Sequence, residues 1–262
     1  MAIGLVGRGY VGTAVQQLFE SHTEVVSWDI RDDVELPADD LKECDVVVVA
    51  VNTPSGKDGN LDASAVEDAI ASVPNKRILL KSTVPPGTTD RLARDLDREI
   101  CFWPEYIGQS SYHNPFFPND IAAVPFVILG GAADITSWCL RLLQPVLGPT
   151  KTYFRCSAIE AEMIKLSENA FLATKVTFVN ELKRICDAVG ADWDTVREGW
   201  LLDPRIGRSH SMVFPDAPGF SGACLPKDTS GLHAAARDAG YDARFIAEVL
   251  ASNDRFRDRS EK

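Results

Sequence analysis

Residues 2–12 read Ala2-Ile-Gly-Leu-Val-Gly-Arg-Gly-Tyr-Val-Gly12, and this stretch decides the fold. The apolar run 2–6 is typical of a buried parallel strand. Gly7, Gly9 and Gly12 follow directly, at a spacing that permits a tight turn, close approach of the backbone to a pyrophosphate, and helix–strand packing. An amphipathic segment comes next. The stretch therefore predicts a strand, a phosphate-binding turn and a helix.

A carboxylate ends the second predicted strand. Residues 24–29 read Glu24-Val-Val-Ser-Trp-Asp29, and Asp29 lies near the spacing of ~20 residues at which an acid holds the adenosine ribose hydroxyls of a dinucleotide. An ordinary glycine turn is the alternative, but the order of strand, glycines, helix and acid favours a dinucleotide. A carboxylate repels a 2′-phosphate, so we expect NAD rather than NADP.

Length, net charge and cysteine spacing exclude several classes of protein. The chain has 262 residues, 45% of them hydrophobic, which is enough for one large or two modest cores. Its net charge of -11 argues against nucleic acid and anionic membranes as partners. No stretch could span a bilayer, and no signal peptide is recognisable. Six scattered cysteines without zinc-type spacing indicate reduced thiols, a cytoplasmic protein and no metal site.

Predicted strands and helices alternate up to residue 155. Strands are expected at 2–6, 24–29, 45–51, 77–81, 100–103, 125–129 and 151–154, with helices between several of them. Such alternation predicts an α/β fold with a Rossmann-type, doubly wound parallel sheet. From Cys156 onward the pattern is nearly all helical. We therefore expect a dinucleotide-binding domain over 1–155 and an all-helical domain over 156–262.

One long helix is predicted over residues 157–189. Between Ala170 and Val179 it is apolar on almost every face, which is typical of a helix buried on all sides. In a small domain this predicts packing against a second copy, hence a homodimer. Lys165 and Asn169 are four residues apart, so they share one face of this helix.

The string Gly219-Phe-Ser-Gly-Ala-Cys-Leu-Pro-Lys-Asp228 delivers Cys224 to a predicted helix start. Pro226 suits the first turn of a helix. Unpaired backbone N–H groups and the positive end of the helix dipole favour a thiolate at such a position. Lys227 and Asp228 add a cation and a proton acceptor. The string therefore predicts a nucleophile, with a buried structural cysteine as the alternative.

Taken together, these motifs resemble the UDP-glucose/GDP-mannose dehydrogenase family. The matching blocks lie in the family's order and run nearly end to end: residues 7–12, 52–56, 81–88, 103–106, 162–169, 203–207 and 219–228. The family's C-terminal domain, which closes over the nucleotide sugar, has no counterpart in these blocks. The resemblance is thus to a short form, and leaves open that a separate chain supplies the lid.

The family oxidises a primary alcohol to a carboxylate in two NAD-dependent steps. The resemblance implies that Cys224 captures the aldehyde as a thiohemiacetal, which a second oxidation converts to a thioester. It implies oxyanion stabilisation by Lys165 and Asn169, and water or proton handling by Asp228, Thr83 and Glu105. For Lys165 and Glu105 the alternative is an ordinary surface position, and for Thr83 a turn hydroxyl.

The resemblance also implies the binding residues. NAD would be held by residues from the glycine turn onward: Gly7, Gly9, Tyr10, Val11, Gly12, Asp29, Thr53, Thr83 and Lys227. The nucleotide-sugar substrate would contact a second set: Glu105, Tyr106, Ile107, Lys165, Asn169, Arg205 and Gly219. Arg205 would reach the neighbouring subunit's substrate, unless it is simply a solvated loop arginine.

Two other functions compete with this interpretation. A beta-hydroxyacid dehydrogenase-like enzyme would perform a single oxidation and also carries a lysine and asparagine four apart on a helix, but Cys224 argues against it. A non-catalytic NAD-binding protein would need none of Cys224, Lys165, Asn169 and Asp228, and all four are present.

Overall fold

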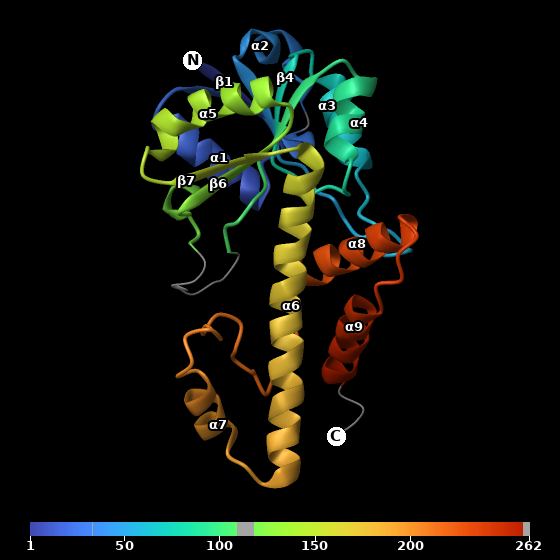
Figure 1. Ribbon diagram of the computed structural model, residues 1–262. Helices are drawn as coiled ribbons and strands as arrows, with labels where there is room; N and C mark the ends of the chain where they lie inside the picture. Colours follow the sequence, from blue (N-terminus) through green and yellow to red (C-terminus); the bar gives the residue numbers. More distant parts are fainter. Residues whose placement is uncertain (33, 109–117, 259–262) are drawn as a thin grey trace. The chain divides into compact units, whose positions relative to one another are not determined.

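The computed structural model describes residues 1–32, 34–108 and 118–258. The chain divides into two compact units, the first comprising Met1–Gly56 and Leu61–Lys165 and the second Lys57–Asn60 and Leu166–Lys262 (Figure 1). The division falls inside the long helix rather than at residue 155, where the sequence pattern predicts a boundary. The start of this helix belongs to the first unit because Ala161 is completely buried in that unit's core.

The first unit is built on a seven-stranded sheet with the order β2-β1-β3-β4-β5-β6-β7. This confirms the predicted α/β class. The strands, each short and largely apolar, are β1 (Ala2–Val6), β2 (Glu24–Trp28), β3 (Val46–Val49), β4 (Arg77–Leu80), β5 (Glu99–Phe102), β6 (Phe126–Gly130) and β7 (Thr152–Cys156). β1 lies between β2 and β3, so the chain reverses its winding direction at β1.

One strand pair departs from the expected parallel sheet. β6 runs antiparallel to β5, with Phe102 opposite Gly130, whereas β6 and β7 are parallel. A parallel pair needs a crossover connection, usually a helix. In the described part of the connection, residues 103–108 and 118–125, only the short η2 (Ile121–Ala123) is helical. Over these described residues no crossover helix precedes β6, which runs in the opposite direction to β5.

Helices cover both faces of the sheet (Figure 1). Helices α1 (Tyr10–Glu20) and α5 (Ala133–Leu147) share one core with inward side chains such as Ile3 and Leu5. The helices α2 (Ala38–Glu43), α3 (Ser64–Ser72) and α4 (Thr88–Asp95) share the other core with residues such as Val47 and Val49. Because strand side chains alternate between faces, the apolar runs of the strands supply both cores.

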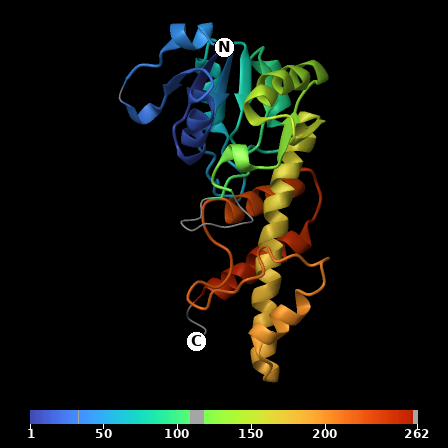
Figure 2. The same cartoon turned by 90° about the vertical axis from the view of Figure 1, so that its left-hand side faces the viewer.

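The second unit is helical. It contains most of α6 (Ala158–Val189), whose bounds match the predicted 157–189, together with α7 (Trp193–Trp200), α8 (Leu225–Asp238) and α9 (Arg244–Arg257) (Figure 2). Two small cores hold it, one around Ala173, Phe220 and Val249 and one around Val179, Cys186 and Trp193.

The apolar middle of α6 is not buried on every side within a single chain. Phe171 and Phe178 are 63% and 53% exposed. Their neighbours Ala170, Ala173 and Val179 face inward and are buried. Within one chain α7, α8 and α9 cover only part of the helix surface, and the exposed part is the one for which the sequence predicts a second copy.

The cysteines and the helices give two further findings. All six cysteines lie in the described ranges, and none of them is in a disulfide. Within the described ranges, no helix combines the length and the apolarity needed to cross a membrane.

A buried carboxylate ties the start of α6 to the start of α4. Glu162 is completely buried, and its two oxygens accept hydrogen bonds from the backbone N–H groups of Gly87 and Thr89. Gly87, the residue before α4, has a φ of 88°, a conformation that suits glycine. The first N–H groups of a helix lack intrahelical acceptors, and a carboxylate there also meets the positive end of the dipole. Glu162 thereby caps α4.

Replacing Glu162 with alanine should lower the free energy of unfolding by about 2–5 kcal/mol, because the buried N–H of Thr89 and the partly buried N–H of Gly87 lose their acceptors at roughly 1–3 kcal/mol each. Chemical denaturation measures this loss. Glu181→Ala, an exposed glutamate on the same helix, is the matched control and should change little. Equal stability of the two variants would contradict the capping role.

Candidate active site

The glycine turn after β1 is shaped to receive a phosphate group. Gly7 has a φ of 93°, and a side chain on Gly12 would place its Cβ 1.9 Å from the Gly7 carbonyl oxygen. A Cβ on Gly9 would meet nothing within 4 Å, so the space beside the turn is open. No side chain caps the N-terminus of α1 at Gly9. Backbone N–H groups and the helix dipole at this position suit an anion, so the residues fit the pyrophosphate of a dinucleotide.

Asp29 directly follows β2 and is buried, as the expected ribose-binding acid should be. Its carboxylate is already engaged. Arg31 donates to both oxygens through its side chain, at 2.6 and 2.9 Å, and the backbone N–H of Arg8 donates at 2.6 Å. The side-chain hydrogen bond from Arg31 holds the pKa of Asp29 well below its usual range. Asp29 is therefore a firmly ionised carboxylate with a cation bound to it.

Other residues expected to bind the cofactor also lie at the carboxyl ends of parallel strands. Tyr10 and Val11 open α1 after β1, and the Tyr10 hydroxyl donates to the carbonyl of Gly108. Thr53 follows β3 and is buried, whereas Thr83 follows β4 and is half-buried. The sheet thus brings residues from distant parts of the sequence to one edge.

A buried ion pair lies at the same edge. Lys81, next after β4, is 2% exposed; its ammonium lies 3.2 Å from a Glu105 oxygen and donates to the Pro104 carbonyl at 2.9 Å. The ammonium also lies 3.8 Å from the centre of the Trp103 ring. Burial lowers the pKa of Lys81, and Glu105 opposes that shift. Glu105 is thus a largely enclosed carboxylate, 12% exposed and paired with a buried lysine, rather than a surface glutamate.

Lys165 is buried as well, which argues against a solvated surface lysine. Its ammonium lies 4.6 Å from the centre of the Tyr106 ring, and this ring packs edge-on against Phe126. The backbone N–H of Ile107 donates to the second Glu105 oxygen. Glu105, Tyr106 and Ile107, three residues implied for substrate, therefore form one ordered segment beside Lys165.

In the second unit, Cys224 stands at the N-terminus of α8, as predicted, and is exposed. Asp228, one turn further on, is 1% exposed. One of its oxygens accepts from the Asn169 amide, and the other from the Lys227 ammonium at 2.6 Å. A buried carboxylate with both oxygens occupied orients its partners, so Asn169, Lys227 and Asp228 form one polar cluster at the first turn of α8, which begins after Cys224.

The last two residues expected to bind substrate, Arg205 and Gly219, form hydrogen bonds with residues outside this cluster. Arg205 is 87% exposed and pairs with Asp203 two residues away, as a solvated loop arginine would. Gly219 is enclosed: a Cβ there would lie 2.5 Å from the Asn253 side-chain oxygen, and its N–H donates to Asn180. Gly219 therefore fits the loop to α6 and α9.

Sequence reasoning missed several positioning residues. Lys81 begins the matching block 81–88, but the sequence pattern did not lead us to predict a role for it. A lysine at the end of an apolar strand nevertheless indicates a buried charge. Asn253 exchanges two hydrogen bonds with the backbone of Phe220, at 2.6 and 3.1 Å, and no local pattern indicates this. Over the residues that the structure describes, no group of three or more acidic, histidine or cysteine side chains could hold a metal ion.

Comparison with known proteins agrees with these motifs. Residues 32–124 match the model of the UDP-glucose/GDP-mannose dehydrogenase family, NAD binding domain, and residues 159–255 match that family's central domain. UDP-glucose 6-dehydrogenase TuaD of Bacillus subtilis is 33% identical over 230 residues, which are 83% of this chain and 48% of the relative. The corresponding enzyme of Pseudomonas aeruginosa is 34% identical over 83% of this chain and 50% of its own length. The chain thus spans about half the length of these relatives.

Two solved structures have the same fold as this chain. A UDP-glucose dehydrogenase from the archaeon Pyrobaculum islandicum superposes with a TM-score of 0.85 at 25% identity, over 97% of this chain and 68% of that one. The 3-hydroxyisobutyrate dehydrogenase of Mycobacterium tuberculosis has a TM-score of 0.69 at 17% identity, over 97% and 93%, and shares the fold. The two domain models together cover most of the chain, and on that basis it belongs to the UDP-glucose/GDP-mannose dehydrogenase family.

Proposed function

We propose that this chain catalyses the NAD-dependent oxidation of a nucleotide sugar's primary alcohol to a carboxylate, with a UDP-glucose-like substrate. The observation that carries the proposal is the cluster in the second unit: an exposed Cys224 at a helix N-terminus, backed by the buried carboxylate of Asp228 and the amide of Asn169. The names of the relatives support the substrate class, since they are UDP-glucose dehydrogenases.

In the first oxidation the alcohol loses a proton and a hydride and becomes an aldehyde. NAD held at the glycine turn would supply the hydride acceptor for each oxidation. Lys165 and Asn169 stabilise negative charge on the substrate oxygen, because a cation and a neutral amide donor both favour an alkoxide. Asp228 accepts or relays the proton, directly or through water.

In the second oxidation the Cys224 thiolate adds to the aldehyde carbon. The resulting thiohemiacetal can release the hydrogen on this carbon as hydride, whereas the aldehyde cannot do so without forming an unstable acylium ion. Loss of the hydride and of the hydroxyl proton yields a thioester. Water then attacks the thioester carbonyl, releasing the carboxylate and the thiol. Glu105 takes the proton of this water and Thr83 positions it. Each substrate therefore produces two NADH.

Substrate recognition in this proposal uses Tyr106, Ile107, Gly219 and Arg205. Arg205 is suited to a partner-borne substrate, because within the described part of the chain its exposed guanidinium bonds only to Asp203, two residues away. Among the cofactor residues, Lys227 acts through Asp228, to which its ammonium is bound.

A single oxidation of the beta-hydroxyacid dehydrogenase type is the competing function. The likeness to 3-hydroxyisobutyrate dehydrogenase shows a shared fold and no more. A single oxidation leaves Cys224 without a task. The number of NADH formed per substrate separates the candidates: two for the proposed enzyme, one for the competitor and none for a protein that only binds NAD.

Cys224→Ala should abolish carboxylate formation while leaving NAD binding unchanged. Measuring NADH and product per UDP-glucose, with calorimetry for NAD, tests this. Cys156→Ala, which removes a half-buried thiol outside the cluster, is the control and should keep the yield of two. Two NADH per substrate from the Cys224 variant would exclude Cys224 as the nucleophile.

Lys81→Met should slow thioester hydrolysis, because it removes the cation that holds Glu105. We expect a rapid burst of two NADH per site followed by slow turnover, with an acyl adduct on Cys224 detectable by mass spectrometry. Glu105→Gln should behave alike, and the double variant should be no slower than either. A merely destabilised enzyme would show a smaller burst and no adduct.

We also propose that the protein is a homodimer through the exposed side of α6. Phe171, Phe178 and Ile185 are spaced by seven residues, so they form one stripe, and each is at least half exposed. A second copy laid along the stripe would remove these side chains from water.

Replacing Phe171 and Phe178 with glutamate should convert the dimer to a monomer. Light scattering at micromolar concentration measures the mass. Phe154→Glu alters an equally exposed phenylalanine on β7 and should leave the mass unchanged. A monomeric wild-type protein at that concentration would refute the dimer.

A further inference from the structure

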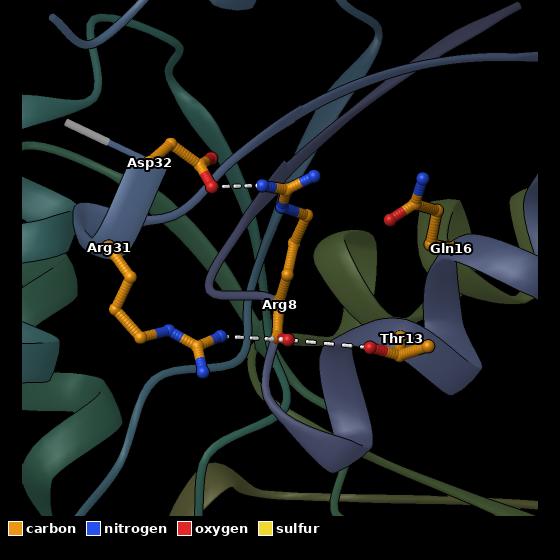
Figure 3. Close-up of a pocket in the computed structure, with 5 residues that line it drawn as sticks. All are labelled: Arg8, Thr13, Gln16, Arg31 and Asp32. Atoms are coloured by element: carbon orange, nitrogen blue, oxygen red, sulfur yellow. Dashed lines mark hydrogen bonds and ion pairs between the residues drawn. The ribbon is translucent and has the colours of Figure 1, made fainter. Parts of the chain in front are cut away.

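A pocket with two arginines lies where a dinucleotide's adenosine ribose would be received. It has a volume of about 290 Å³ and is lined by Arg8, Thr13, Gln16, Arg31 and Asp32 (Figure 3). Arg8 is the residue between the first two glycines of the turn, and Arg31 follows two residues after Asp29. The Arg8 guanidinium pairs with Asp32, and the Arg31 guanidinium donates to the Arg8 carbonyl at 3.0 Å (Figure 3).

The carboxylate of Asp29 has no capacity left for a ribose. One oxygen accepts from the Arg31 backbone N–H at 3.0 Å and from its Nε at 2.6 Å. The other accepts from the Arg8 backbone N–H at 2.6 Å and from Arg31 Nη2 at 2.9 Å. An ionised carboxylate offers about four acceptor sites. All four are occupied, so a ribose hydroxyl can bond to Asp29 only after the Arg31 side chain leaves.

The two arginines of the pocket differ in how firmly their guanidinium groups are held. Arg31 is 68% exposed, so its side chain can swing away without disturbing the core. Among the residues that the structure describes, the buried Arg8 Nε has no hydrogen-bond partner. Once Asp29 binds the ribose, the pocket holds a released guanidinium and an unsatisfied N–H. A phosphate accepts hydrogen bonds from both, and arginine suits it through bidentate geometry.

We propose that Arg31 determines cofactor specificity and that this protein binds NADP as well as NAD, with the 2′-phosphate received by Arg31 and Arg8. The proposal rests on the dinucleotide use proposed above. An arginine near the end of the second strand is the known means of accommodating a 2′-phosphate in this fold. Asp29 alone would exclude that phosphate, and Arg31 offsets the exclusion.

The summed charge of the acidic and basic groups around the pocket also favours binding of a 2′-phosphate. Asp29 and Asp32 carry two negative charges, and Arg8 and Arg31 carry two positive ones, so the four groups sum to zero. Without Arg31 the sum is -1, which repels a dianionic phosphate. NAD must separate Arg31 from Asp29 and offers that arginine no new partner. NADP compensates with its phosphate, so Arg31 favours NADP relative to NAD.

Arg31→Ala tests the proposal because it should act on the two cofactors in opposite directions. By calorimetry, the wild-type protein should bind NADP within about tenfold of NAD. In the variant, the Kd for NADP should rise at least about tenfold, as loss of one charge-assisted contact to phosphate implies, while the Kd for NAD should stay equal or fall. Arg94→Ala, an exposed arginine on α4 paired with its neighbour, is the control and should change neither.

Comparing the binding of adenosine 2′,5′-bisphosphate with that of 5′-AMP measures the contribution of the 2′-phosphate alone, because the two compounds differ only in that group. The wild-type protein should prefer the bisphosphate, and Arg31→Ala should lose that preference while keeping the wild-type melting temperature. Tight NAD binding with NADP more than about 100-fold weaker would overturn the inference and leave the proposed function intact. An equal loss for both cofactors in Arg31→Ala would also overturn it. Failure of the wild-type protein to bind either cofactor would refute the proposed function too.

Discussion

Four parallel strands, β1, β3, β4 and β5, end at the same edge of the sheet, and the chemistry of the first unit depends on this constraint. Both faces of the sheet are covered by helices, so polar groups have no room there. Backbone groups and side chains beyond the strand ends are the first that can meet a ligand. Gly7, Thr53, Thr83 and Glu105 all follow such ends.

Buried charges in this protein are held in place by partners. Lys81 neutralises Glu105, and Lys165 lies over the Tyr106 ring. In the other unit, Asp228 accepts from Asn169 and Lys227. A buried ion without such partners would be strongly destabilising, so its partners fix where it points. Fixed direction is also what a catalytic group requires, because stabilisation of a developing charge depends on donors already in place.

A charge pair also lies beside the glycine turn, but unlike the buried pairs it can change partners. Asp29 and Arg31 are close in the chain, and their pair is accessible to solvent on the arginine side. Such a pair can exchange partners, whereas Lys81 and Glu105 cannot do so without exposing a buried charge. The family match begins at residue 32, so the loop with Arg8 and the segment with Arg31 lie outside it.

The sequence by itself determined the elements and their order: the glycine turn, the acid after the second strand, the bounds of α6 and the cysteine at a helix start. These follow from local patterns, since backbone hydrogen bonding and side-chain period act over a few residues. Tertiary structure alone decided that β6 reverses, that Lys81 holds Glu105, and that Asn169 meets Asp228 across 59 residues. Such pairings depend on which elements pack together, and no local period encodes the partner of a buried charge. The Asp29–Arg31 pair spans only two residues, yet whether that carboxylate faces a ribose or a guanidinium is likewise decided by the folded loop.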